Sequence, residues 1–239
     1  MSTVDFVASP TISQFIRSRK FYAVCCGARG SGKTSGGLIR IIKRAQDQDR
    51  QYWPLKWACV RDTRKNIGLT VARTIQFWFP APYAQWRGKA EEPESCLIVL
   101  EARPAVQIDF FGVNSPADHD RFQSYEASGG IWIEEPCPMA TNTEFIASGI
   151  AESVLATAQT SVRGAPGGGI QVTMNPPSAD HWVAQLWQLE GYEAAGEMEA
   201  EMGEEQRRER EKIRRNSDVF MMPAEENAAE RMTPGYRER

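Results

Sequence analysis

The sequence predicts an α/β fold with a mostly parallel central β-sheet flanked by helices. Short apolar runs without polar alternation recur along the chain, which is typical of strands buried on both faces. Segments with helical periodicity separate these runs, and a Gly-rich motif joins the first run to the first such segment. The 239 residues, 41% of them hydrophobic, suffice for one large domain with a substantial core.

The expected strands are short and their order along the chain alternates with helices. They are residues 21–26, 56–61, 96–101, 106–113, 130–135 and, as the last of the sheet, 170–174. The intervening Ala-Arg-Pro predicts a hairpin between the third and fourth. Helices are expected after residue 34, over 67–78 and over 152–162, and residues 1–20 form a lead-in whose Phe15 and Ile16 dock on the domain.

The Gly-rich motif is a complete phosphate-binding loop. Residues 27–34 read Gly-Ala-Arg-Gly-Ser-Gly-Lys-Thr and match G-x-x-x-x-G-K-[ST] between a strand and a helix. The glycines let backbone N–H groups converge on phosphate oxygens, Lys33 adds a positive charge, and the Thr34 hydroxyl can ligate Mg²⁺. The motif therefore predicts binding of a nucleoside triphosphate, ATP, with Mg²⁺. The predicted contacts are Gly27, Ala28, Arg29, Gly30, Ser31, Gly32, Lys33, Thr34 and Ser35.

Two adjacent carboxylates end the apolar strand 130–135. The first, Glu134, is assigned to the Mg²⁺ shell, although Asp is the more usual residue there. The second, Glu135, is placed to polarise the water that attacks the γ-phosphate. A kinase or a nucleotide switch would not need this second carboxylate, so the pair favours hydrolysis.

Asn175 ends the strand 170–174 and is followed by two prolines. Its amide could contact the γ-phosphate or the attacking water, or it could simply open a Pro-rich turn. The residues alone leave both interpretations open.

Composition excludes several other classes of protein. No apolar stretch approaches the roughly 20 residues of a membrane span, and no signal-peptide pattern opens the chain. The five cysteines lack metal-ligand spacing and read as small buried residues in a reducing cytosol, and His119 and His181 have no ligand-spaced companions. With a net charge of −3, any nucleic-acid contact must use a local basic patch.

The composition changes after residue 187. Residues 190–216 are dominated by Glu and Arg and predict a solvated charged helix or a flexible arm. We therefore divide the chain into a P-loop domain, residues 1–187, and a charged helical segment with a linker or tail, residues 188–239.

The ordered motifs resemble the ATPase domain of the large terminase subunit of tailed bacteriophages. The resemblance rests on the phosphate-binding loop with its internal Arg29, on 60–64, and on 121–126 leading into 130–135. It extends through 173–177 with His181 and Trp182. Residues 219–223, Asn227 and 234–236 resemble the family's junction with its nuclease domain.

This resemblance implies an ASCE-type, RecA-like P-loop ATPase that assembles as a homo-oligomeric ring on the portal. Such a motor works with a small terminase subunit in the host cytoplasm and translocates double-stranded DNA into a procapsid. By the same likeness, Arg29 contacts the γ-phosphate within the subunit, Gln14 reads the adenine and Asn175 couples hydrolysis to movement. Arg121 is the candidate arginine finger for a neighbouring subunit, with Arg61, Arg64 and Arg73 as alternatives. The nuclease domain that usually follows would begin where this chain ends, so no DNA cleavage is expected.

Other functions are compatible with the same loop. A helicase or DNA-repair ATPase shares the fold, but a complete helicase needs a second set of motifs. A nucleotide-gated assembly module would bind ATP with little turnover, and a small-molecule kinase would need an acceptor-binding lid. Turnover stimulated by double-stranded DNA separates the motor from the last two.

Overall fold

A computed structural model describes residues 6–114, 116–137, 149–189, 202–223 and 226. Its strands are β1 (Tyr22–Cys26), β2 (Leu55–Arg61), β3 (Ala84–Lys89), β4 (Glu92–Leu100), β5 (Arg103–Gly112), β6 (Gly130–Glu134), β7 (Gly169–Met174) and β8 (Ser217–Met221). Its helices are α1 (Pro10–Arg17), α2 (Lys33–Gln46), α3 (Arg64–Leu69), α4 (Val71–Trp78), α5 (Pro116–Gln123), α6 (Glu152–Ser161), α7 (Trp182–Trp187) and α9 (Glu204–Arg215), with a 3₁₀ turn at Arg50–Tyr52.

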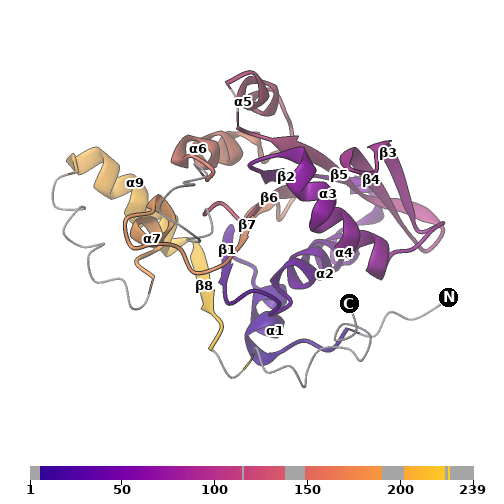
Figure 1. The fold of residues 1–239 in the computed structure, drawn as a ribbon, viewed down its shortest axis with the longest axis horizontal. Helices are drawn as coiled ribbons and strands as arrows, with labels where there is room; N and C mark the ends of the chain where they lie inside the picture. The colour runs from indigo at the N-terminus through magenta and orange to yellow at the C-terminus, as the bar shows by residue number, and fades with distance from the viewer. Residues whose placement is uncertain (1–5, 115, 138–148, 190–201, 224–225, 227–239) are drawn as a thin grey trace.

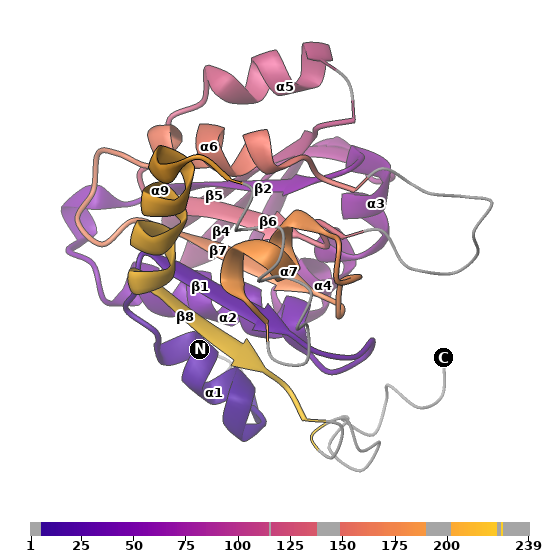
Figure 2. The same ribbon diagram turned by 90° about the vertical axis from the view of Figure 1, so that its left-hand side faces the viewer.

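The strands form one eight-stranded sheet in the order β3-β4-β5-β2-β6-β7-β1-β8 (Figures 1 and 2). Every neighbouring pair from β5 to β8 is parallel, and the β3-β4-β5 edge is antiparallel. The predicted α/β fold with a mostly parallel sheet is confirmed, as is the hairpin between β4 and β5. Because β7 lies between β6 and β1, residues that follow all three strands meet at one carboxyl edge of the sheet.

Helices cover both faces of the sheet, and alternate strand residues face each layer. On one side α5, α6, α7 and α9 pack on the face that carries Val24, Ile133 and Val172. On the other side α2, α3 and α4 pack over Trp57 and Trp132, while α1 covers the β1 end. Figure 2 shows the sheet between these two layers. This burial on both faces explains the apolar runs of the central strands.

Three features differ from the sequence-based expectation. The helix expected over 67–78 is two helices that break at Thr70, whose hydroxyl donates to the Asn66 carbonyl and accepts from Arg61. The lead-in contains the helix α1, and its Phe15 is fully buried as expected. Residues 170–174 are not the last strand, because β8 pairs with β1 from the far side.

The charged segment is helical where the structure describes it. Arg210 and Ile213 of α9 are buried, and Arg210 donates to both carboxylate oxygens of Glu152 on α6 at 2.9 Å. This ion pair fixes α9 to the helical layer, whereas most other charged side chains of α9 are exposed. Residues 190–201, 227 and 234–236, on which part of the expectation rested, lie outside the described residues.

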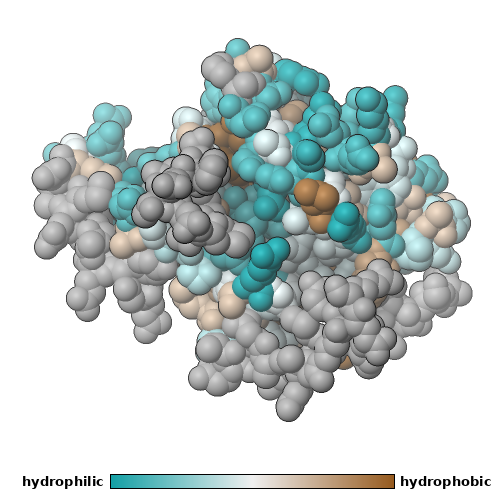
Figure 3. Space-filling model, in the orientation of Figure 1, coloured by the Kyte–Doolittle hydropathy of each residue, from teal (hydrophilic) through white to brown (hydrophobic). Residues whose placement is uncertain are grey.

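Within the described ranges, no helix is long and apolar enough to cross a bilayer. On the coloured part of the face in Figure 3, hydrophobic residues form small separate patches, one of them over α3. The larger exposed apolar side chains include Leu69 and Phe77.

Close packing at the start of β6 leaves no room for a side chain at Gly130. Gly130 has a φ of 147°, and a Cβ there would lie 2.2 Å from the Gly169 carbonyl oxygen and 2.8 Å from the Trp57 ring. We expect Gly130→Ala to destabilise the fold by more than about 2 kcal/mol in denaturant unfolding. Gly203→Ala, where a Cβ meets nothing within 4 Å, should cost less than about 1 kcal/mol. Equal losses in the two variants would contradict this packing.

Candidate active site

The phosphate-binding loop connects the carboxyl end of β1 to the amino end of α2. Gly30 and Gly32 have φ values of 79° and 86°, in the left-handed region that glycine adopts without strain. A Cβ on Gly32 would meet no atom within 4 Å, so the space beside the start of α2 is open. The amino terminus of a 14-residue helix faces this space, which favours an anion there.

The segment after β8 supports the start of the loop. The Met222 backbone N–H donates to the Cys26 carbonyl at 2.8 Å. A Cβ on Gly27 would lie 2.8 Å from the Met222 Cβ, so this glycine permits the close approach. The sequence offered no signal that residues near 220 would touch the nucleotide loop.

Lys33 is almost fully buried at the base of the loop. Its Nζ donates to the Ala28 carbonyl at 2.8 Å, to Ser31 Oγ at 3.3 Å and to Asn175 Oδ1 at 3.2 Å. The ammonium therefore joins the loop to the residue that follows β7.

Thr34 and Glu134 also meet, although they lie 100 residues apart. Thr34 Oγ1 donates to Glu134 Oε1 at 2.7 Å, and Thr173 Oγ1 donates to Glu134 Oε2. Trp132 Nε1 in turn donates to Thr173 Oγ1 at 2.6 Å, which orients that hydroxyl. Thr173 and Trp132 are site residues that the sequence analysis missed, because their roles depend on the order of the strands.

Burial, together with the neighbouring charge of Glu135, raises the pKa of Glu134 to about 7. The two threonine hydroxyls and the charge of Arg61 act in the opposite direction. Glu134 is 1% exposed, so a bound cation would relieve a large desolvation penalty on its ionised form.

The Thr34–Glu134 pair fits the donor chemistry of Mg²⁺. Hydroxyl and carboxylate oxygens are the hard ligands that Mg²⁺ takes, and it retains several waters and phosphate oxygens. Within the described parts of the chain, no group of three or more His, Cys, Asp or Glu side chains could hold a metal by itself. A metal here would therefore depend on the nucleotide for further ligands.

Glu135 lies next to Asn175 in a strained backbone position. Its φ is 49°, which is unusual for a residue with a side chain and which turns the chain sharply at the end of β6. The Asn175 backbone N–H donates to Glu135 Oε2 at 3.1 Å, and the Glu135 N–H donates to the Thr173 carbonyl at 2.8 Å. Such strain is found at functional sites, where the surrounding structure sustains it.

The arginines selected from the sequence lie in four different places. Arg29 is exposed in the phosphate-binding loop. Arg121 on α5 and Arg64 on α3 line one small pocket beyond the end of β5. Arg61 ends β2, donates to Thr70 Oγ1 at 2.8 Å and acts electrostatically on Glu134, whereas Arg73 is exposed on α4.

Gln14 lies on α1, and Ser35 lies in the first turn of α2. Gln14 is exposed on α1, and α1 packs against α2. Ser35 Oγ accepts a hydrogen bond of 3.0 Å from Trp78 Nε1, so α4 covers the first turn of α2. These contacts do not test whether Gln14 recognises adenine, so that role stays a prediction.

Comparisons with known proteins identify the fold. No protein-family profile matches the sequence, and no curated protein sequence is similar to it. The large terminase of a thermophilic bacteriophage superposes with a TM-score of 0.63 at 12% identity, over 98% of this chain and 50% of that one. The chain has the fold of the large terminase ATPase domain. It spans about half the length of that terminase.

Two further structures agree with this assignment. The same phage protein in complex with ADP matches with a TM-score of 0.59 at 13% identity, over 98% of this chain and 49% of that one. A mutant ATPase domain of the Thermus phage P74-26 large terminase matches with a TM-score of 0.53 at 12% identity, over 95% and 86%. The predicted resemblance is thus confirmed at the level of the fold.

The raised pKa of Glu134 makes stability depend on pH in a defined direction. Between about 4.5, where the unfolded carboxyl ionises, and about 7, the folded state retains the extra proton. The stability of the parent therefore falls as pH rises through this window. Without Mg²⁺, we expect the melting temperature of Glu134→Gln minus that of the parent to increase from pH 5 to pH 8. A difference that does not change with pH would refute the raised pKa.

Proposed function

We propose that this chain is the ATP-hydrolysing motor of a viral DNA-packaging machine and translocates double-stranded DNA into a procapsid. The large terminase ATPase fold supports this proposal, as does the ADP-bound terminase of the same fold. The observation that carries it is the hydrogen-bonded set Lys33–Asn175–Glu135, beside Thr34–Glu134, at one edge of the sheet.

Hydrolysis needs a base near the γ-phosphate, and Glu135 suits this role. It is partly exposed, so water can reach its carboxylate, whereas Glu134 is buried and protonates near pH 7. Mg²⁺, held by Thr34 and Glu134, would neutralise charge on the phosphates. Glu135 would then accept a proton from the attacking water, and the backbone N–H of Asn175 orients the carboxylate.

Asn175 suits the coupling role because it contacts both the phosphate-binding loop and the proposed base. Its side chain accepts from Lys33 and its backbone donates to Glu135. A triphosphate in the loop would compete for the Lys33 ammonium, release the Asn175 side chain and free it for the γ-phosphate. The chain from Asn175 to α7 would report this change to the helical layer.

A ring of these chains would complete the site. Arg29 would contact the γ-phosphate within its own subunit. Arg121 and Arg64, which share one pocket at the α5 end, would face the nucleotide of a neighbour, and one of them would act as the arginine finger. The expected partners are double-stranded DNA, the portal and the small terminase subunit, in the host cytoplasm.

Replacement of the proposed base tests the assignment directly. We expect Glu135→Gln to bind Mg·ATP as the parent does but to lower steady-state hydrolysis by about 10²–10⁴-fold. Glu205→Gln, an exposed position on α9, is the control with the same change of charge and should leave the rate unchanged. If Glu135→Gln hydrolyses ATP at the parental rate, Glu135 is not the base.

Assembly and DNA should both raise turnover. A trans arginine is worth roughly 10³–10⁵ in rate in well-studied systems, so specific activity should rise with protein concentration. Addition of double-stranded DNA should raise it again, and Arg121→Ala should remove the concentration dependence. Activity that is independent of both DNA and concentration would favour an ATPase that is not a packaging motor.

A further inference from the structure

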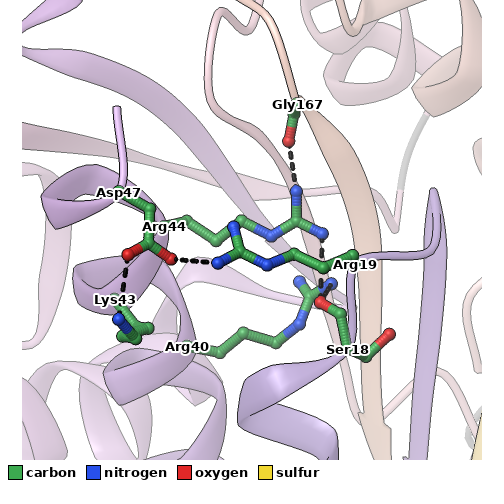
Figure 4. Close-up of polar contacts among 7 residues, drawn as sticks. All are labelled: Ser18, Arg19, Arg40, Lys43, Arg44, Asp47 and Gly167. Atoms are coloured by element: carbon green, nitrogen blue, oxygen red, sulfur yellow. Dashed lines mark hydrogen bonds and ion pairs between the residues drawn. The ribbon is translucent and has the colours of Figure 1, made fainter. Parts of the chain in front are cut away.

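A basic cluster lies at the amino edge of the sheet, opposite the phosphate-binding loop. We use this name for Arg19, after α1, and for Arg40, Lys43 and Arg44 of α2 (Figure 4). Arg44 donates to the carbonyls of Lys20 and Gly167, which precede β1 and β7. The nucleotide loop follows the carboxyl end of β1, so the two places lie at opposite ends of the same strand.

The two inner arginines of the cluster are buried, and within the described part of the chain they form no hydrogen bond to a carboxylate. Arg40 is fully buried and donates to Gln171 Oε1 at 3.1 Å and to the Ser18 carbonyl at 3.4 Å. Arg44 is 6% exposed and donates only to carbonyl oxygens, including that of Ser18. The Nε atoms of both arginines have no hydrogen-bond partner among the described residues.

The positive charges in the cluster repel one another. The pKa of Arg40 is lowered to about 9 by burial and by Arg44. Burial and Arg19 lower the pKa of Arg44, and the charge of Asp47 opposes them. Asp218, which accepts from Ser18 Oγ at 2.8 Å, partly offsets the charge of Arg40. Buried cations whose charge is only partly offset are costly, so this arrangement favours an additional anion.

The outer residues of the cluster leave room for such an anion. A crevice of about 60 Å³ lies between residues 16–19 and the end of α2, where Lys43, Arg44 and Asp47 line it. Asp47 accepts from Arg19 at 2.7 Å and from Lys43 at 2.8 Å, and it is the carboxylate in the crevice lining. Arg19 and Lys43 are 67% and 49% exposed, so both can turn from Asp47 to a ligand.

We propose that this crevice is a second anion site, which binds a phosphate group through Arg19, Lys43 and Arg44. Arginine and lysine provide the charge-assisted donors that phosphate oxygens take. The phosphate could belong to a free ion or to the DNA backbone, since both present the same oxygens. The site does not depend on ATP hydrolysis, so it can be tested separately from the motor function.

Inorganic phosphate is the first probe. The full chain should carry Lys33→Ala, so that the nucleotide loop no longer takes the anion, and its melting temperature should be followed against phosphate at constant ionic strength. We expect a saturable rise in melting temperature, which the double variant Arg19→Gln with Lys43→Gln abolishes. The control pair Arg87→Gln with Lys89→Gln removes the same charge on the exposed strand β3 and should leave the rise intact.

The substitution Asp47→Asn should strengthen phosphate binding, whereas the Arg19 and Lys43 double variant should lose it. Because Asp47 competes with the ligand for Arg19 and Lys43, its neutralisation should lower the phosphate concentration at half-saturation by about fivefold. A purely structural role for the cluster would not produce tighter binding. The proposal is overturned if phosphate causes no saturable rise, or if the Arg19 and Lys43 double variant responds as its control does.

A short DNA duplex identifies the source of the phosphate. If the site binds the DNA backbone, the logarithm of the DNA association constant should fall less steeply with the logarithm of salt concentration in the Arg19 and Lys43 double variant. The magnitude of this slope should be smaller by roughly two than in the control. Equal slopes, together with a phosphate response that only the cluster variant loses, would assign the site to a free oxyanion.

Discussion

The buried carboxylate of Glu134 is the interaction on which the candidate site depends. It ends β6, but the loop that it serves follows β1, and β7 separates the two strands. Glu134 nevertheless accepts a hydrogen bond directly from Thr34, and Thr173 of the intervening strand donates to its other oxygen. Burial of this carboxylate disfavours its ionised form and so raises its pKa. The same penalty makes a bound cation favourable at this position.

The approach of α2 to the sheet explains why these groups can touch. Gly37 leaves space for the Trp132 ring, since a Cβ there would lie 2.9 Å from it. The two polar residues of β7 that face α2, Gln171 and Thr173, then bond inward: Gln171 Nε2 donates to the Gly37 carbonyl at 3.0 Å, and Thr173 bonds Glu134. The buried amide of Gln171 is therefore bonded by the helix that carries the phosphate-binding loop, and the Thr173 hydroxyl by the neighbouring strand β6.

The fold class and the residues that follow the central strands could be predicted from the sequence, because apolar runs and the loop motif are local signals. It did not reveal Thr173 as a partner of Glu134, since that contact depends on strand order. It also missed β8, a five-residue edge strand whose residues are mostly half-buried and carry no periodic pattern. The burial of Arg210 could not be read from a run of charges, because its partner Glu152 lies on another helix.

The helix α2 connects the two ends of the molecule at which anions are favoured. It begins with Lys33 and Thr34 and carries Arg40 and Arg44 two to three turns later, a separation of roughly 10–15 Å at 1.5 Å per residue. Packed helices move as rigid units, so a shift of the first turn on nucleotide binding would displace the arginines by a similar amount. Arg44 holds the segments that enter β1 and β7, and β7 leads to Asn175. Any displacement of α2 would therefore act on both strands that carry the candidate site, because Arg44 of the basic cluster bonds the segments that enter them.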